Sequence, residues 1–398
     1  MSRLAEICAA ALVAQPDLDP RSRQVLTHIA ECKTPALGFN VSRCPSTDHD
    51  YRDIHYNSCR DRHCPQCQGP QRRLWVEQRL NELLPVRYFH VVFTIPAELW
   101  AIFGLAPRTC LDILFRAAHA SLLQSAAAPD NGAFIPGGIS VLHTWNQKLG
   151  FHPHVHCIVP SGGLSIGQGN WHIGGGEFLL PIRAVTKLYR AILLAELEKA
   201  LEQGSLNRLD RHTIKHQLCL AAAKDFVVYC KPPFGGPRQV LKYLGRYTHR
   251  VGISEQRIIA GGAGTDTVTF TWTDRGHGHA KRKLTVPRQE FINRFRRHIL
   301  PRGFKKIRYF GFMGNRQRKR KLADIRRLIA EAGCALPIET GQHADDFTEP
   351  TVPICPVCGA ALVRENRDDC RSEEIGIPLC ERLGFLRLVS PVQAGPPA

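Results

Sequence analysis

The 398-residue sequence lacks the features that define several large classes of protein. No stretch approaches the roughly 20 uninterrupted apolar residues of a membrane-spanning helix. The first residues lack the basic segment and apolar core of a secretory signal. A Gly-x-x-x-x-Gly-Lys-Ser/Thr loop is also absent, so helicase activity is not supported. We therefore expect a cytoplasmic protein without an ATP-driven motor of its own.

Acidic residues are scarce relative to basic ones. The chain has 35 Asp and Glu against 53 Lys and Arg, which gives a formal net charge of +18. A surplus of this size favours a polyanionic partner, and nucleic acid is the usual one. Hydrophobic residues make up 43% of the chain, which is ordinary for a globular protein with a large core.

The cysteines are numerous but are not expected to form disulfide bonds. Fifteen of them in a reducing compartment, several in Cys-x-x-Cys spacing, are better explained by metal binding. The stretch from Cys64 to Cys67 is a knuckle whose two thiolates can bind one tetrahedral Zn²⁺. The zinc candidates of this region are Cys32, Cys44, Cys59, Cys64 and Cys67.

The remaining ligands of this zinc ion must come from upstream of the knuckle. Cys44 is followed three residues later by Thr47, where a second Cys-x-x-Cys pair would have its second cysteine. Arg60 and Arg62 stand among the ligands and favour contact with phosphate, although a solvated basic face is the alternative. The candidates for the missing ligands are Cys32, His49, Cys59 and His63.

A second pair of closely spaced cysteines lies far along the chain. Beyond Glu339 the composition becomes acidic and rich in proline, and Cys355 and Cys358 have the same Cys-x-x-Cys spacing. Together with Cys370 and Cys380 they predict a second, weaker zinc ribbon.

A pair of histidines is the candidate for a catalytic metal site. Side chains alternate along a β-strand, so His154 and His156 project from one face of their strand. Two neutral imidazoles leave coordination positions open for a third ligand and a substrate oxygen. The alternative is a surface strand whose histidines bind no metal. The candidates for a third ligand are His143, His90 and Gln239, each of which has a purely structural alternative.

A helix predicted after Pro237 carries two tyrosines and three cations. Four residues make about one helical turn, so Tyr243 and Tyr247 share a face. Packing in a core is the alternative for these two rings. A metal at the histidine pair would polarise a phosphodiester, and a tyrosine beside cations is then the natural nucleophile. The cations of the adjoining stripe are Lys242, Arg246 and Arg250.

The order of strands and helices predicts an α+β fold. Runs of β-branched and aromatic residues predict strands at 88–95 and 139–145, which join the histidine strand in a central antiparallel sheet flanked by helices. The expected domains are N-terminal helices with a zinc-binding module (1–85), an endonuclease core (86–300), a basic aromatic DNA-binding tract (301–333) and an acidic, proline-rich tail (334–398).

The basic aromatic tract is dense in charge. Residues 302–327 hold eleven Lys and Arg against a single Asp. Cations along a backbone and aromatic rings on bases are typical of single-stranded nucleic acid binding, and a solvated basic face is the alternative. The interleaved aromatic residues are Phe304, Tyr309, Phe310 and Phe312.

Several of these stretches together resemble a known enzyme family. On these motifs the chain resembles a rolling-circle transposase of the insertion sequence ninety-one family, within the class of His-hydrophobe-His endonucleases. Thr47 departs from the family pattern, in which cysteine is usual, and His49 is the expected substitute. The matching stretches are Tyr56–Cys67, Phe89–Thr94, Leu142–Trp145, His152–His156 and Tyr243–Arg250.

The resemblance implies a metal-dependent endonuclease and strand transferase. Such an enzyme nicks single-stranded DNA at an element end, forms a 5′-phosphotyrosine link and leaves a free 3′-hydroxyl. His154 and His156 would bind Mg²⁺ or Mn²⁺, Tyr243 and Tyr247 would be nucleophiles, and the N-terminal cysteines would hold structural Zn²⁺.

The implied partners are single-stranded element ends and target DNA at the bacterial nucleoid, with no membrane and no small-molecule substrate. The alternatives are a plasmid or phage rolling-circle replication initiator, and a non-catalytic zinc-dependent DNA-binding protein.

Overall fold

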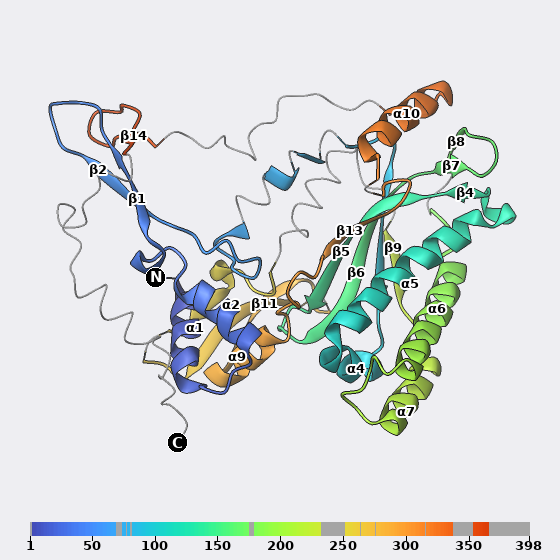
Figure 1. Cartoon of the computed structure of the whole chain (residues 1–398), viewed down its shortest axis with the longest axis horizontal. Coiled ribbons are helices and arrows are strands. Elements are labelled where there is room, and N and C mark those ends of the chain that lie inside the picture. The colour runs from blue at the N-terminus through green and yellow to red at the C-terminus, as the bar shows by residue number, and fades with distance from the viewer. Residues whose placement is uncertain are drawn as a thin grey trace, which may run out of the picture. The chain divides into compact units, whose positions relative to one another are not determined.

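The chain folds into two compact units, seen in a computed structural model (Figure 1). The first unit draws on Met1–Gly69, Ile253–Asn293 and Gln342–Ala398, and the second on Pro70–Gly252 and Arg294–Gly341. The residues that the structure describes are 2–68, 74–76, 78–79, 82–174, 179–231, 251–262, 264–274, 276–314, 316–336 and 353–365.

A five-stranded antiparallel sheet is the centre of the second unit. Its strand order is β13-β5-β6-β3-β9, so the strand with the histidine pair, β6, is the middle one. The sheet and its helices confirm the predicted α+β fold. The strands are β3 (Tyr88–Thr94), β5 (Gly137–Trp145), β6 (Phe151–Pro160), β9 (Val228–Lys231) and β13 (Ile307–Gly311).

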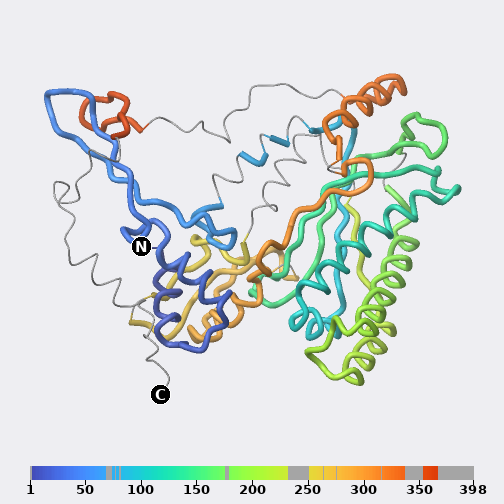
Figure 2. Tube along the Cα trace, viewed as in Figure 1, coloured from blue at the N-terminus to red at the C-terminus, as the bar shows by residue number. Residues whose placement is uncertain are grey.

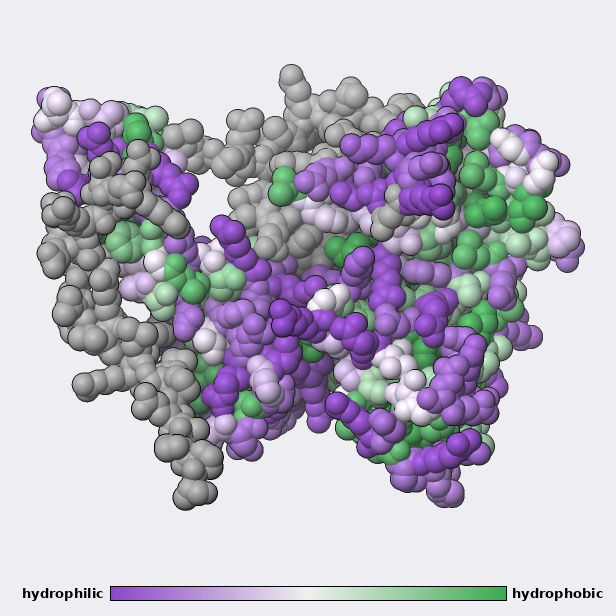
Figure 3. Space-filling model, viewed as in Figure 1, coloured by the Kyte–Doolittle hydropathy of each residue, from purple (hydrophilic) through white to green (hydrophobic). Residues whose placement is uncertain are grey.

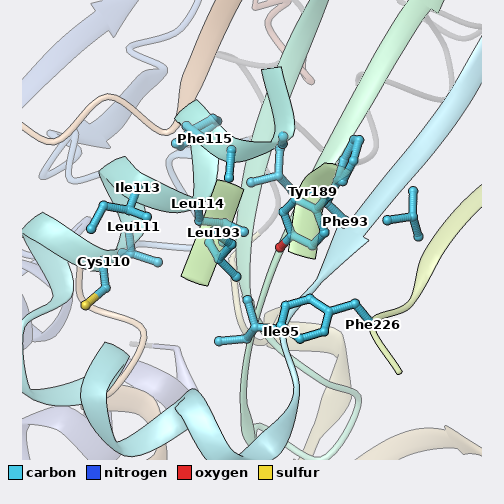
Figure 4. Close-up of a cluster of buried hydrophobic side chains, with 14 of the residues drawn as sticks. Phe93, Ile95, Cys110, Leu111, Ile113, Leu114, Phe115, Tyr189, Leu193 and Phe226 are labelled. Atoms are coloured by element: carbon cyan, nitrogen blue, oxygen red, sulfur yellow. The ribbon is translucent and has the colours of Figure 1, made fainter. Parts of the chain in front are cut away.

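Helices cover one face of this sheet (Figure 1). The covered face is apolar: Val155 of β6 and Phe93 of β3 are fully buried. Phe93 is labelled in Figure 4 with other side chains of this core. Tyr189 packs beside Phe93 and donates a hydrogen bond from its hydroxyl to the Thr94 carbonyl, 3.0 Å away. The helices are α4 (Trp100–Leu105), α5 (Pro107–Ala127), α6 (Ile182–Glu202) and α7 (Arg211–Ala222).

The basic tract contributes both a strand and a helix to the second unit. β13 pairs with β5, and the helix α10 (Arg318–Glu331) buries Leu322, Ile325 and Ile329 while its cations face outward. Figure 3 shows the hydrophilic residues that cover α10. A small sheet of β4 (Phe134–Ile135), β7 (Gly163–Ser165) and β8 (Trp171–His172) completes this unit.

The aromatic residues of the basic tract have structural roles. Phe304, Phe310 and Phe312 are 2%, 5% and 4% exposed, so these three rings are not available to stack on bases. The Arg318 guanidinium lies over the ring of Tyr309, 4.0 Å from the ring centre. The Tyr309 hydroxyl accepts a hydrogen bond from Arg79 at 2.5 Å. Hydrophobic burial of these rings outweighs their use at the surface.

The first unit combines N-terminal helices with strands from later in the chain. α1 (Arg3–Ala14) and α2 (Pro20–Ala30) have side-chain N-caps from Ser2 and Asp19. Three strands between residues 258 and 287 also belong to this unit. They are β10 (Ile258–Ala260), β11 (Thr267–Asp274) and β12 (Ala280–Pro287), and α9 (Arg288–Arg296) follows directly.

A second three-stranded sheet in the first unit joins distant parts of the chain. It has the order β14-β1-β2, and all its pairs are antiparallel. The strands are β1 (Phe39–Arg43), β2 (Arg52–Tyr56) and β14 (Val363–Arg364). Among the described helices of the whole chain, none combines the length and apolar character that crossing a bilayer requires.

Packing around His119 predicts a pH-dependent stability. Its Nε2 lies 2.7 Å from the Ser140 hydroxyl and its ring stacks on Phe310. Burial, aided by the nearby Arg308 charge, lowers the pKa of His119 from 6.5 to about 4. Between pH 6.5 and about pH 4, the His119 side chain is therefore protonated in the unfolded chain and neutral in the folded chain. We expect this group to reduce the free energy of unfolding by up to about 3 kcal/mol as the pH falls from 6.5 to 4.

Urea unfolding at pH 7.5 and pH 4.5 measures this loss. His119→Gln should make it smaller, and His216→Gln, which changes an exposed histidine on α7, should leave it unchanged. An equal loss in the wild type and in His119→Gln would contradict the assignment.

Candidate active site and metal centres

Three histidines meet on the face of the sheet opposite the one that α5 and α6 cover, where His143 and His156 are 4% and 8% exposed. One ring nitrogen each from His143, His154 and His156 lies within 4.8 Å of those of the other two. Strand register explains the meeting: His143 of β5 is directly opposite His154 of β6, and Val141 is opposite His156. Side chains two residues apart share a face, so all three imidazoles project together.

Hydrogen bonds set the orientation of two of these rings. Nδ1 of His154 lies 2.6 Å from the His152 carbonyl oxygen, so Nδ1 carries the proton and donates it. Nδ1 of His156 lies 2.8 Å from Nε2 of His90 on β3. In both rings the Nδ1 contact leaves Nε2 as the nitrogen suited to hold a metal.

His90 acts on the cluster through His156 and is not itself among the three grouped histidines. Burial chiefly, and then the charges of Lys231 and His154, lower the pKa of His90 to about 3. His90 is therefore neutral near pH 7 and can accept a proton from Nδ1 of His156. Of the three candidates for a third ligand, the structure places His143 in the cluster, whereas Gln239 lies outside the described residues.

The donor set fits a divalent transition metal. Three neutral imidazoles on one side leave the opposite side open for oxygen ligands. Imidazole nitrogen suits Mn²⁺ better than Mg²⁺, which prefers oxygen. Of the two metals expected from the sequence, the residues present therefore favour Mn²⁺.

The edge strand β9 adds two exposed side chains to the same face. Val92 of β3 pairs with both His156 and Tyr229, so Tyr229 lies in line with the metal cluster, two strands or about 10 Å away. Its ring is 52% exposed, and Lys231 on the same strand is also exposed. The shared face of these two outward residues and the histidines follows from the sheet register.

Four cysteines of the first unit form a closed tetrahedral set. Sγ of Cys67 lies 3.5 Å from Sγ of Cys32 and 3.6 Å from Sγ of Cys59, and Cys64 completes the group. Four thiolates around one Zn²⁺ are separated by about 3.8 Å, given zinc–sulfur bonds of about 2.3 Å. The upstream ligands of the knuckle are thus Cys32, which follows α2, and Cys59, which follows β2.

His63, another candidate for this centre, has a different partner. The Asp61 carboxylate accepts hydrogen bonds from the His63 backbone (2.9 Å) and ring (2.8 Å), and lies 3.0 Å from the His28 ring. Burial raises the pKa of Asp61, but these hydrogen bonds outweigh burial and hold the pKa well below its ordinary value. Asp61 therefore fixes the loop that carries the knuckle.

Cys44 is not part of the four-cysteine set. It lies with His49, Cys355 and Cys358 in a separate group. The predicted companions of that second knuckle, Cys370 and Cys380, are outside the described residues.

Of the cations and tyrosines predicted to act on DNA, the structure describes Arg60 and Arg62. Arg60 is exposed beside the four-cysteine set, and Arg62 is half-buried, with its pKa lowered by burial and by the Arg21 charge. The predicted tyrosine helix lies outside the described residues, and so do its members Tyr243, Tyr247, Lys242, Arg246 and Arg250.

Comparisons with known proteins identify matching families for both units. Residues 137–321 match the family model "Putative transposase", and residues 4–95 match "Transposase zinc-binding domain". A Sinorhizobium fredii protein named "Putative transposase y4qJ" is 42% identical over 353 residues, covering 86% of this chain and 88% of that protein. The "Transposase for insertion sequence element IS801" of Pseudomonas savastanoi is 29% identical, covering 89% of this chain and 86% of that protein.

Among solved structures, a "Conjugative Relaxase TRWC in complex with ORIT dna" is 13% identical. The match covers 40% of this chain and 68% of the relaxase chain. Its TM-score of 0.22 is too low to show a shared fold.

The histidine cluster predicts a graded loss of Mn²⁺ affinity on substitution. His143→Ala removes a ligand and should weaken Mn²⁺ binding by at least about 100-fold, whereas His90→Ala removes an orienting partner and should cost about 10-fold. Electron paramagnetic resonance of free Mn²⁺ during titration measures both. His152→Ala is the matched control, because His152 is on the same face of β6 but outside the cluster. Equal affinities in the wild type and His143→Ala would show that His143 is not a ligand.

Proposed function

Because the chain belongs to the insertion sequence ninety-one family of transposases, we propose that it nicks and rejoins single-stranded DNA at element ends by a rolling-circle-like mechanism. As a transposase it is a DNA-processing enzyme. The observation that supports this mechanism best is the cluster of three imidazoles on two neighbouring strands of the five-stranded sheet. Such a cluster is suited to bind the oxygen of a phosphodiester through a metal.

The proposed reaction is a transesterification at phosphorus. The hydroxyl oxygen of Tyr243 or Tyr247 forms a bond to the phosphorus, and the bond from phosphorus to the 3′ oxygen breaks. The phenolic proton is passed on to the departing 3′ oxygen, so the products are a 5′-phosphotyrosine and a free 3′-hydroxyl. One phosphodiester is exchanged for another, and strands can therefore be rejoined without external energy.

The residues of the site divide the work of this step. Mg²⁺ or Mn²⁺, when held by His143, His154 and His156, supplies Lewis acidity to the scissile phosphate. His90 holds His156 in the tautomer that presents Nε2. Lys242, Arg246 and Arg250 would favour the phenolate of a tyrosine whose pKa is otherwise about 10.

A specificity for single strands is supported by the open face of β9. Tyr229 offers an exposed ring on which a base can stack, and Lys231 offers a cation for the adjacent phosphate. Both point to the side of the sheet that carries the histidines. A duplex keeps its bases stacked on one another and presents no base face to Tyr229.

We expect a covalent protein–DNA adduct. Incubation with Mn²⁺ and a 3′-labelled single-stranded oligonucleotide of an element end should give a labelled protein band on a denaturing gel, because the 5′-phosphate of the downstream strand is attached. Tyr243→Phe with Tyr247→Phe should abolish the band, and each single variant should rank the two nucleophiles. Tyr229→Phe, which removes a hydroxyl from the same face, is the control and should keep the band.

Failure of every element-end sequence to give an adduct would contradict the enzymatic mechanism. A non-catalytic zinc-dependent DNA-binding protein would bind the oligonucleotide equally well with and without the two tyrosine hydroxyls.

We also expect Tyr229 to contribute to DNA affinity. Tyr229→Ala should weaken binding of a single-stranded oligonucleotide by about 5- to 100-fold, which corresponds to the roughly 1–3 kcal/mol of one base stacked on an aromatic ring. Tyr229→Phe should bind as the wild type does, and duplex binding should change little. Fluorescence anisotropy at fixed salt measures all three. An equal loss for Tyr229→Ala on single strands and duplex would refute the stacking role.

A further inference from the structure

We propose that Cys44, His49, Cys355 and Cys358 form a second zinc centre, which fixes a segment from beyond residue 350 to the β1–β2 hairpin of the first unit. Their ligand atoms lie within 4.8 Å of one another. The zinc-binding family model ends at residue 95, so it contains neither Cys355 nor Cys358. The centre is separate from the four-cysteine set and shares no residue with it.

Distances within this group are those of metal ligands and not of a disulfide. Sγ of Cys44 lies 3.4 Å from Sγ of Cys358, and Nε2 of His49 lies 3.2 Å from Sγ of Cys355. A disulfide requires about 2.05 Å between its sulfurs. Three thiolates and one imidazole make a Cys₃His donor set, which is a common structural zinc site.

Each half of the group is a tight turn that aims two ligands at one point. In the first half, the Cys44 backbone donates to the Tyr51 carbonyl at 2.9 Å and closes the turn between β1 and β2. His49 lies within that turn, so its long side chain reaches the position that a cysteine at residue 47 would serve. Thr47 thus has a substitute five residues after Cys44.

The second half is a knuckle closed by its own backbone. The Cys355 backbone donates to the Ala360 carbonyl, and the Gly359 backbone donates to the Cys355 carbonyl, both at 2.8 Å. Gly359 has a φ of +76°, a left-handed conformation that favours glycine. This is the loop geometry that presents two thiolates of a Cys-x-x-Cys pair to one ion.

Within the described part of the chain, the segment 353–365 makes a small set of other contacts with the hairpin. Three buried residues, Cys44, Cys355 and Leu362, form its hydrophobic cluster, Tyr51 and Ala360 pack against them, and Arg43 pairs with Glu365 at 3.8 Å. β14 pairs with β1 through two residue pairs, and the Glu365 backbone donates to the Val41 carbonyl at 3.0 Å. A contact of this size cannot offset the entropy of ordering thirteen residues, and metal ligation is the usual remedy in so small a module. Figure 2 shows the segment beside the hairpin.

Zinc content of the full-length protein tests the proposal. With the histidine cluster filled by Mn²⁺, we expect two zinc ions per chain by inductively coupled plasma mass spectrometry. Cys355→Ser with Cys358→Ser should leave one, and so should Cys64→Ser with Cys67→Ser, which removes the other centre. Cys219→Ser is the matched control, because Cys219 is an exposed cysteine outside both groups, and it should retain two.

Cobalt substitution tests the ligands without relying on stability. The thiolate-to-Co²⁺ absorption of the wild type should reflect seven thiolates, four in one group and three in the other. His49→Cys should raise this absorption while two ions stay bound, because it converts Cys₃His to Cys₄. A fall to four thiolates is expected for the Cys355→Ser, Cys358→Ser variant.

Proteolysis tests the structural consequence. Trypsin should cut near Arg364 faster in the Cys355→Ser, Cys358→Ser variant than in the wild type, while cleavage within the second unit stays unchanged. One zinc ion in the wild type, or two in the Cys355→Ser, Cys358→Ser variant, would overturn the proposal. Neither result depends on whether the tyrosines cut DNA.

Discussion

Along β6, the side chains that point toward the helices are apolar and those that point away include three imidazoles. Val155 and Cys157 are fully buried in the core, whereas His154 and His156 lie on the opposite face of the sheet. A register slip of one residue would exchange the two sets, placing imidazoles in the core and apolar side chains in water. The large hydrophobic core therefore specifies the metal cluster: the same burial that stabilises the sheet also determines which way the histidines point.

The part of this site that follows from local pattern could be predicted. His154 and His156 are two residues apart on one strand, so their shared face needs only the strand period. The choice of His143 over His90 depends on which residues of β5 and β3 stand opposite β6. That register is set by the packing of the whole sheet and cannot be inferred from any short stretch of sequence. Sequence reasoning could therefore name both candidates without ranking them.

The zinc ligands also fall into two groups, those that local spacing predicts and those that the fold brings together from distant parts of the chain. Cys64 and Cys67 belong to one turn and are recognised by their spacing. Cys44 and Cys355 are more than 300 residues apart, and the sequence around each of them does not identify the other as its partner. The one local signal was Thr47, which left the first half of a pair incomplete. In the basic tract the cations Lys305, Lys306 and Arg308 obscured a strand, β13, whose Phe310 is buried.

The pairing of β1 with β14 has a consequence for how the protein is made. A ribosome adds about 5–20 residues per second, so Phe39–Arg43 is made about 15 to 65 s before Val363–Arg364. During that interval one edge of the β1–β2 hairpin lacks its native neighbour and offers unpaired backbone groups to other chains. A chain that is truncated before residue 363 lacks β14, so the backbone groups at that edge of β1 stay unpaired. Completion of the first unit therefore requires that translation has passed residue 364.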